Sequence, residues 1–291
     1  MPDTVEFYHE VRKGIRVGKI ILLNTPIGNL ADLTPRVREA LEKGDIFAVE
    51  DTRVFRELLN HLGISISGKK IFSLHDQSES SQVNKLLELT HGGDLYVASE
   101  AGSPIVSDPA YPIVLAAYEK GIEIDSFSGV SSPIMALELS GLPPIPFHFH
   151  GFLPRESGKR AKIFNETNYG THIFFEAPTR IEETMDELAE LLPDVRVAIA
   201  RELSKKFQQV VRFKASEWSE VKEQVTMFKG EFILMFHRDV AIAQLGKEVR
   251  ELAQEILANQ GGPKNLAKLL GAILDRPTKD IYSEMTRQKR E

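Results

Sequence analysis

The chain reads Leu22-Leu23-Asn24-Thr25-Pro26-Ile27-Gly28-Asn29-Leu30 where an apolar run stops at a turn of Asn, Thr, Pro and Gly. The run begins at Lys19 and predicts a short buried strand. After the turn, Thr34 and Pro35 predict the N-cap and the first residue of a helix, and Gly44 predicts its end. The segment therefore predicts a strand, a loop and a helix in succession.

The same order returns three more times before residue 142. Predicted strands at 46–49, 95–98 and 122–127 each run into a polar or small-residue loop and then into a helix that ends near a glycine. Alternating short strands and capped helices indicate a mostly parallel sheet that is covered on both faces. Ligands of such sheets bind beyond the carboxyl ends of the strands, so we expect the four loops to surround one cleft.

Composition limits the class of protein. The 291 residues carry a net charge of -6, which argues against a uniformly basic polyanion binder, so any nucleic-acid contact must be local. The absence of cysteine excludes disulfides and thiolate chemistry and is typical of a cytoplasmic protein. Residues 1–18 contain no apolar core segment, so we expect neither a signal peptide nor a membrane span there.

A break in composition at 140–146, with three prolines, predicts a connector between two domains. We expect an extension at 1–18, an N-terminal α/β domain at 19–142, a C-terminal α/β domain at 143–239 and a helical segment at 240–291. In the second domain, strands are predicted at 147–152, 172–176, 195–201 and 231–237, with helices at 159–168, 181–192 (capped by Thr179) and 216–228. The tail predicts three short helices. Two of these, at 264–274 and 278–289, fit either a helix-turn-helix that binds a nucleic-acid backbone or a simple packing or dimerisation helix.

Six blocks of sequence carry a family resemblance, at 25–30, 50–53, 99–104, 151–154, 174–176 and 200–205. In chain order they resemble the signature blocks of the bacterial ribosomal RNA small subunit methyltransferase I family, a branch of the tetrapyrrole methylase superfamily. The resemblance covers nearly everything from Lys19 to Arg238. No G-x-G-x-x-G fingerprint is present, so a nicotinamide or flavin site has little support.

The resemblance implies a two-domain α/β fold with mostly parallel sheets and a small helical C-terminal segment. It implies that S-adenosyl-L-methionine is the cofactor, bound in the cleft between the domains, and that the chain usually forms a homodimer. Separately, we expect no metal site and no membrane association. The implied reaction is methylation of the ribose 2'-hydroxyl of a cytidine in small-subunit (16S) ribosomal RNA. Methylation of a small molecule such as a tetrapyrrole, and a non-catalytic binding protein, remain alternatives because fold does not determine substrate.

Small residues in the loops allow the backbone to approach a donor molecule closely, and a helix start offers N–H groups to a carboxylate. For Gly102, the alternative is a turn that merely needs a positive φ. The residues that the resemblance assigns to the cofactor are Pro26, Gly28, Glu100, Gly102, Ser103, Pro104, Gly129, Ser131, Ser132, Phe152 and Glu176.

A ribose hydroxyl is a poor nucleophile, so its attack is helped by a base that takes the proton. The residues expected on the acceptor side are Asp51, Glu50, Arg53 and His75, and Lys205 is a further candidate base. Asp51 equally fits a helix N-cap, Arg53 a surface ion pair and His75 a structural role. The sequence leaves these alternatives open.

Two segments concentrate basic residues near predicted cleft loops. Residues 155–162 hold four basic residues and one acidic residue, and residues 201–214 hold five and one. We expect RNA contacts there, with ordinary solvated surface as the alternative. The residues named for RNA are Arg155, Lys159, Arg160, Arg201 and Lys205.

Overall fold

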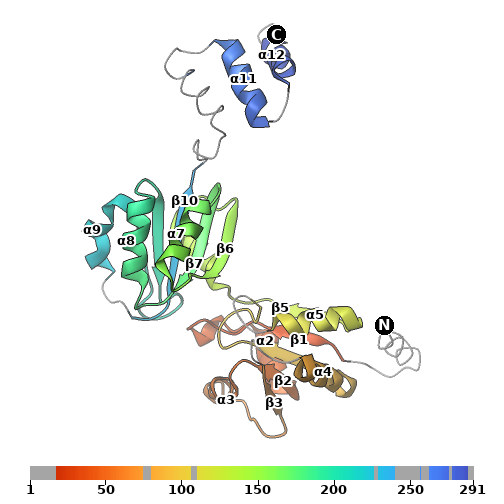
Figure 1. The fold of residues 1–291 in the computed structure, drawn as a ribbon. Coiled ribbons are helices and arrows are strands. Elements are labelled where there is room, and N and C mark those ends of the chain that lie inside the picture. Colours follow the sequence, from red (N-terminus) through yellow and green to blue (C-terminus); the bar gives the residue numbers. More distant parts are fainter. Residues whose placement is uncertain are drawn as a thin grey trace. The chain divides into compact units, whose positions relative to one another are not determined.

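A computed structural model describes residues 18–74, 80–105, 110–225, 229–239, 256, 262–274 and 277–287 (Figure 1). They form two compact units. The first holds the described residues up to His237 except Thr167–Gly170, and the second holds Thr167–Gly170 and the described residues from Arg238 onward.

The first sheet is fully parallel, with the strand order β3-β2-β4-β1-β5. Its strands are β1 (Ile20–Leu23), β2 (Ile46–Val49), β3 (Lys70–Ser73), β4 (Leu95–Ala98) and β5 (Ile124–Phe127). Leu23 pairs with Ala98 and with Phe127, so the carboxyl ends of these strands lie at the same edge. The predicted parallel sheet is confirmed, and β3 is an addition that the sequence analysis missed.

Helices cover both faces of this sheet. The helices are α2 (Pro35–Lys43), α3 (Thr52–His61), α4 (Ser80–Glu88) and α5 (Tyr111–Lys120), and short 3-10 turns occur at Leu30–Asp32 and Leu89–Gly92. Alternate residues of β1 separate the two cores: Ile21 and Leu23 pack with α2 and α3, whereas Ile20 and Leu22 pack with α4 and α5. This alternation is the reason the strands read as continuous apolar runs.

Local capping follows the sequence. Thr34 Oγ1 accepts a hydrogen bond from Val37 N at 3.3 Å, and Gly121 and Gly141 end their helices in the left-handed conformation. Helix α6 (Ser132–Ser140) starts after β5, but its Ala136 and Leu137 pack with the second sheet. The Asp-Pro pair at 108–109, whose sequence predicts an N-cap and a first helical residue for the helix that follows, lies outside the described residues.

The second sheet has the order β6-β7-β10-β8-β9. Its strands are β6 (Phe147–Phe152), β7 (Gly170–Glu176), β8 (Arg196–Arg201), β9 (Gln209–Lys214) and β10 (Phe232–Arg238). β6 and β7 are parallel, whereas β8 runs antiparallel to both β9 and β10. The expectation of a mostly parallel sheet is therefore wrong for this module. β9 was not predicted, and it forms a hairpin with β8.

Helices α7 (Ser157–Glu166) and α8 (Ile181–Leu191) cover one face of the second sheet, and the predicted helix at 216–228 is replaced by short turns around α9 (Trp218–Val221). Those turns are the 3-10 segments Ala215–Glu217 and Lys222–Gln224. The predicted cap of α8 is also wrong: Arg180 occupies the N-cap position, without a side-chain hydrogen bond to the helix start.

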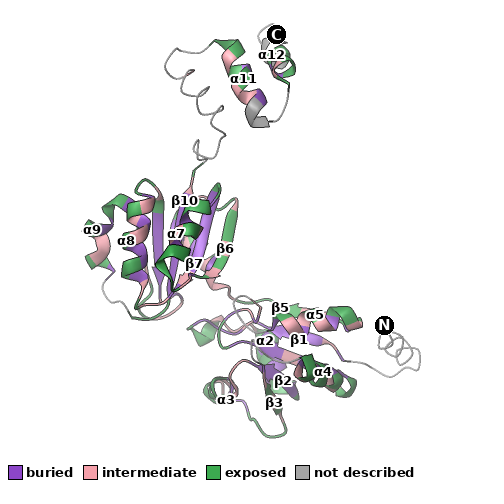
Figure 2. Cartoon of the chain, in the orientation of Figure 1, coloured by how far each residue is buried: buried purple, intermediate pink, exposed green. Residues whose placement is uncertain are grey.

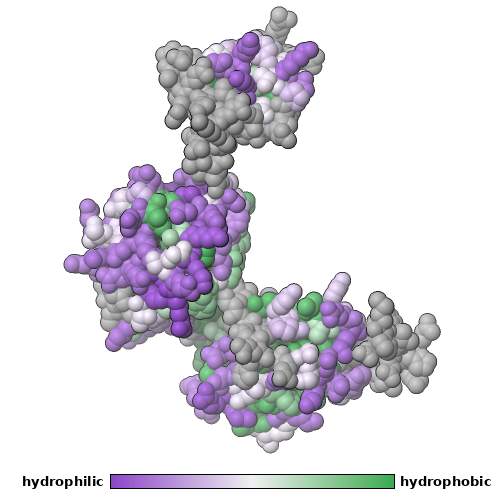
Figure 3. All heavy atoms as spheres, viewed as in Figure 1, coloured by the Kyte–Doolittle hydropathy of each residue, from purple (hydrophilic) through white to green (hydrophobic). Residues whose placement is uncertain are grey.

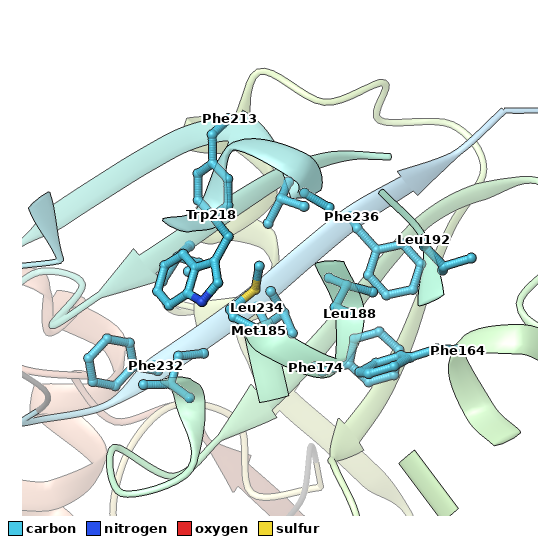
Figure 4. Close-up of a cluster of buried hydrophobic side chains, with 14 of the residues drawn as sticks. Phe164, Phe174, Met185, Leu188, Leu192, Phe213, Trp218, Phe232, Leu234 and Phe236 are labelled. Atoms are coloured by element: carbon cyan, nitrogen blue, oxygen red, sulfur yellow. The ribbon is translucent and has the colours of Figure 1, made fainter. Parts of the chain in front are cut away.

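The core of this module lies between β10 and the helices. Phe164, Phe174, Met185, Trp218 and Phe236 are among the buried side chains gathered there (Figure 4). Figure 2 shows buried strands in the middle of the sheet and exposed outer helix surfaces. Hydrophilic side chains predominate over α8 and α9 on the face seen in Figure 3.

The second unit contains helices α11 (Pro263–Leu274) and α12 (Thr278–Arg287), which pack against each other and bury Ala267 and Ile281. They match two of the three helices predicted for the tail, and of the stretch 240–261 that holds the third only residue 256 is described. Within the described part of the chain, no helix has both the length and the apolar character needed to cross a membrane.

Candidate active site

A cavity of about 460 Å³ lies in the first unit. Its volume falls within the range of about 300–1,000 Å³ that is usual for small-molecule sites. The lining residues come from the loops of both sheets: Ile27, Glu50, Glu100, Ala101, Gly102, Ser103, Ser131, Ser132, Pro133, Phe152, Phe175, Glu176, Ala177, Pro178, Leu203, Gly230, Glu231, Phe232 and Ile233.

The loops after β1, β2, β4 and β5 all reach this cavity, which confirms that the four loops gather at one place. Two of them are joined by backbone hydrogen bonds, because Thr25 N donates to Gly102 O and Gly102 N to Thr25 O, each at 3.0 Å. Gly102 has φ +80°, and a Cβ there would lie 3.3 Å from Ile27 Cγ2. Gly102 therefore both permits a left-handed turn and lines the cavity.

The start of helix α6 forms another wall. Ser131 is the N-cap residue, with extended backbone and no side-chain hydrogen bond to the helix, and Ser132 is the first helical residue. Both line the cavity. The first N–H groups of a helix have no partner within it and carry partial positive charge, so this wall suits an anionic group.

Gly129 does not line the cavity but shapes the loops that do. A Cβ on Gly129 would lie only 2.4 Å from Asn24 Cβ, so glycine lets the loops after β1 and β5 approach each other. Asn24 Nδ2 holds them together by donating to Phe127 O at 2.7 Å. Gly129 is not among the lining residues, and neither are Pro26, Gly28 or Pro104; Gly28 instead abuts the side chain of Lys205.

The second sheet supplies a largely apolar wall, including Phe152, Phe175 and Ile233. Residues 230–233 also line this wall, and they were not predicted as site residues. Phe232 at the start of β10 pairs with Arg201 at the end of β8, because these strands are antiparallel. The start of β10 therefore reaches the same edge as the end of β8. The turn at Lys229-Gly230 was the available signal, but strand direction was needed to interpret it.

Glu176 belongs to this wall but its carboxylate is fully engaged. It is buried and accepts hydrogen bonds from Ala177 N at 2.6 Å, Arg180 Nε at 2.8 Å and Thr184 Oγ1 at 2.8 Å. Arg180 Nη2 also donates to Leu153 O at 3.3 Å. The network joins the loop after β7 to the loop after β6. Glu176 thus shapes the cavity wall through its neighbours.

Acidic side chains gather at the first-sheet wall. Glu50 Oε2 accepts a hydrogen bond from Glu100 N at 3.2 Å, and both residues line the cavity. Burial raises the pKa of the Glu100 carboxyl, and the nearby carboxylates of Glu50 and Asp51 raise it further. Glu100 therefore retains its proton to a higher pH than an ordinary glutamate does.

Asp51 is the N-cap of α3, and its carboxylate accepts from Arg53 N at 2.6 Å and Arg53 Nη2 at 2.7 Å. Hydrogen bonds from the Arg53 side chain and backbone hold the pKa of Asp51 well below its usual range. Neither residue lines the main cavity, and Arg53 is 84% exposed. The cap and ion-pair alternatives are confirmed for this pair. His75 lies outside the described residues.

The basic residues named for RNA divide into two groups. Arg160 is completely buried, with Nε 2.8 Å from Glu187 Oε2 and Nη1 2.7 Å from Arg155 O. Arg201 is also buried, and its Nε donates to Lys229 O at 2.8 Å. For Arg160 the expectation of a phosphate contact is wrong, because its donors face protein acceptors. For Arg201 the RNA contact stays a prediction.

Lys205 is half-buried and ion-paired with Glu202 at 3.0 Å and Glu231 at 3.1 Å. By contrast, Arg155 and Lys159 are exposed, and Lys159 pairs with the exposed Glu156 at 2.8 Å. Those two remain available to a polyanion. Over the described residues, no group of three or more His, Cys, Asp or Glu side chains could hold a metal ion.

Comparisons with known proteins agree with this arrangement. The model of the family Tetrapyrrole (Corrin/Porphyrin) Methylases matches residues 19–218. The chain is 37% identical over 221 residues to the ribosomal RNA small subunit methyltransferase I of Halalkalibacterium halodurans, covering 75% of each chain. It is 35% identical over 274 residues to the protein of the same name from Xylella fastidiosa, covering 91% of this chain and 98% of that one.

Solved structures support the fold. A cobalt precorrin-4 methyltransferase of cobalamin biosynthesis matches with a TM-score of 0.53 at 16% identity, covering 75% of this chain and 94% of that one. A diphthine synthase matches with a TM-score of 0.51 at 14% identity, covering 75% and 88%. The chain belongs to the tetrapyrrole methylase family and, within it, to the ribosomal RNA small subunit methyltransferase I group.

Proposed function

We propose that this protein is an S-adenosylmethionine-dependent methyltransferase that modifies the ribose 2'-hydroxyl of a cytidine in small-subunit (16S) ribosomal RNA. The observation that carries the proposal is one cavity whose lining includes Gly102, Ser103, Ser131, Ser132, Glu50 and Glu100. The names of the relatives support ribosomal RNA as the substrate.

The chemistry of the lining fits S-adenosylmethionine. The start of α6 at Ser131 suits the carboxylate of the methionine part, because helix N–H groups bind anions. Glu50 and Glu100 attract the positive charges of the sulfonium and the ammonium groups. The apolar wall that includes Phe152 suits the adenine ring.

The donor supplies an electrophilic methyl carbon: the new O–C bond forms while the C–S bond breaks, the sulfur leaves as a neutral thioether, and the hydroxyl proton goes to a base. The protein must align the oxygen with that carbon and exclude competing water. The apolar side chains of Phe175 and Ile233 beside the polar loops suit this exclusion.

As the proton acceptor, Glu100, which the resemblance assigned to the cofactor, is favoured over Asp51, which was a candidate base. Glu100 lines the cavity, and a raised pKa makes its carboxylate a stronger proton acceptor. The Asp51 carboxylate is committed to Arg53 and to the helix cap, and its pKa is lowered. We therefore assign the proton to Glu100, with Glu50 beside it and with Asp51 supporting the start of α3.

The experiment is methyl transfer from labelled S-adenosylmethionine to small ribosomal subunits from cells that lack the modification. We expect label in a nucleotide whose 3'-phosphodiester resists alkaline hydrolysis, the signature of a 2'-O-methyl group. Label in a base would contradict the proposed atom. Transfer to tetrapyrrole precursors but not to subunits, or donor binding without any transfer, would support the alternatives instead.

Two partner assignments belong to the same proposal. Arg155 and Lys159 contact the RNA backbone, so binding to subunits should weaken steeply with salt. The chain acts as a homodimer, which sedimentation equilibrium on the full chain tests directly. A monomer at working concentration would remove this part and leave the reaction untouched.

A further inference from the structure

We propose that the loop at 202–208 is an RNA-docking element in which Phe207 stacks on a nucleobase and Lys206 meets the neighbouring phosphate. This inference rests on the proposed function, because it concerns how the RNA approaches the cavity. It assigns the contact to residues other than the buried Arg201 and the ion-paired Lys205.

The loop joins the cavity to the surface over a few residues. Leu203 is buried and lines the cavity, whereas Phe207 is 57% exposed. The loop is the connection between strands β8 and β9. Leu203 and Phe207 therefore belong to one short loop, and a nucleobase stacked on Phe207 would bind to the loop that also lines the cavity.

The loop is held in an unusual conformation. Glu202 and Ser204 are the two described residues other than glycine with positive φ, at 50° and 62°. Left-handed backbone is disfavoured for such residues and persists only where the surroundings enforce it, most often at functional sites. The strain therefore indicates that this loop shape is maintained for a purpose.

The enforcing contacts are specific. The Glu202 carboxylate accepts hydrogen bonds from Lys205 Nζ and from Glu231 N, each at 3.0 Å. A Cβ on Gly230 would lie 2.5 Å from that carboxylate, so glycine makes room for it. These contacts anchor the base of the loop beside the cavity.

The tip is anchored as well. Ser204 N donates to Gln208 Oε1 at 2.7 Å, and Gln208 N donates to Lys205 O at 3.1 Å. Ser204 Oγ is hydrogen-bonded to Asp32 of the first-sheet loops. Because the backbone is closed on both sides of Phe207, the exposed ring is presented by a preorganised loop, which reduces the entropy lost on binding.

The chemistry at the tip matches single-stranded RNA. Lys206 Nζ lies 5.6 Å from the centroid of the Phe207 ring, so an aromatic face and a positive charge occur together. Aromatic side chains that stack on unpaired bases, flanked by cations for the backbone, are the usual means of binding single-stranded nucleic acid. Ordinary exposure of a lone Phe would not require an anchored loop.

The test compares Phe207→Ala with Tyr118→Ala. Tyr118 is a matched control because it is another exposed aromatic residue, 78% exposed, on helix α5 and outside the cavity lining. We expect Phe207→Ala to raise the KM for small subunits about tenfold, with the donor Kd and the melting temperature unchanged. Phe207→Trp should retain a near-normal KM, and Phe207→Leu should remain impaired because it lacks a ring. Tyr118→Ala should behave as the wild type.

Lys206→Ala provides an independent readout. One phosphate contact fewer should reduce the slope of log affinity against log salt by about 1. An unchanged KM in Phe207→Ala, or an equal rise in Tyr118→Ala, would overturn the inference. A change of oligomeric state in Phe207→Ala would also overturn it, by showing a protein–protein surface. Failure of the wild type to methylate subunits would instead remove the proposed function on which it rests.

Discussion

The guanidinium of Arg180 holds the buried carboxylate of Glu176, with Nε 2.8 Å from Oε1. Its Nη2 also donates to Leu153 O in the loop after β6. From helix α7, which follows that loop, Arg160 Nη1 donates to Arg155 O. Two arginines thus fix the backbone of a loop that begins beside Phe152, which lines the cavity. Their role is to position the wall.

Glu176→Gln should weaken this arrangement, because an amide cannot satisfy the charge of Arg180. We expect a loss of about 1–3 kcal/mol in the free energy of unfolding and a clearly weaker donor affinity, measured by denaturant titration and calorimetry. Asp186→Asn is the control, because Asp186 on helix α8 is an exposed carboxylate outside the cavity lining that accepts a hydrogen bond from Trp218 Nε1 at 2.8 Å. Equal donor affinities in the two variants would contradict a positioning role.

Gly102→Ala should both strain the backbone and crowd Ile27. The left-handed φ of +80° alone costs about 1–2 kcal/mol for a residue with a Cβ. Gly63→Ala isolates that cost, because Gly63 has φ +71° and open space where a Cβ would be. We expect both variants to lose stability but only Gly102→Ala to bind the donor more weakly. Normal donor binding by Gly102→Ala would argue against its place in the site.

We expect the ionisation of Glu100 to determine how kcat/KM falls at acidic pH. Because its pKa is raised in the folded protein, the limb in kcat/KM should lie above the ordinary glutamate value of about 4.3. Glu100→Gln should remove the limb along with most of the activity. The exposed residue Glu119 on α5 gives the control Glu119→Gln, which should leave the profile unchanged.

The same shift has a stability consequence. A carboxyl whose folded pKa is raised favours the folded state below its pKa and opposes it once ionised above that pKa. Glu100→Gln should therefore raise the melting temperature at neutral pH and leave it unchanged at about pH 3, below both values. A lower melting temperature at neutral pH would show that the ionised form is stabilised by the site.

Arg160→Met tests whether Arg160 stabilises the fold and does not contact RNA. The variant loses hydrogen bonds to Glu183, to Glu187 and to backbone carbonyls, so we expect a destabilisation of about 1.5–3 kcal/mol. The salt dependence of subunit binding should keep its wild-type slope. By contrast, Arg155→Ala should reduce the salt slope of subunit binding by about 1 and leave the free energy of unfolding unchanged. A reduced slope in Arg160→Met would restore it as an RNA contact.

The strands missed by the sequence analysis show why pattern alone was insufficient. β3 reads Lys-Ile-Phe-Ser at the edge of the first sheet, where its residues are only partly buried. β9 mixes Gln, Arg and Lys with apolar residues, so it was counted within a basic segment. Both strands are edges of their sheets. An edge strand pairs with only one neighbour, and its weak apolar pattern alone does not show that this pairing occurs.

The sequence by itself determined the local features of the fold. The strand segments 20–23, 46–49, 95–98 and 124–127, the caps at Thr34 and Asp51 and the turn at Gly102 depend on a few neighbouring residues, so short-range propensity was sufficient. Tertiary structure alone decided that Arg160 and Arg201 are buried and that Phe232 reaches the cavity. Burial and strand direction depend on contacts between residues far apart in sequence, and these are established only when the sheets assemble.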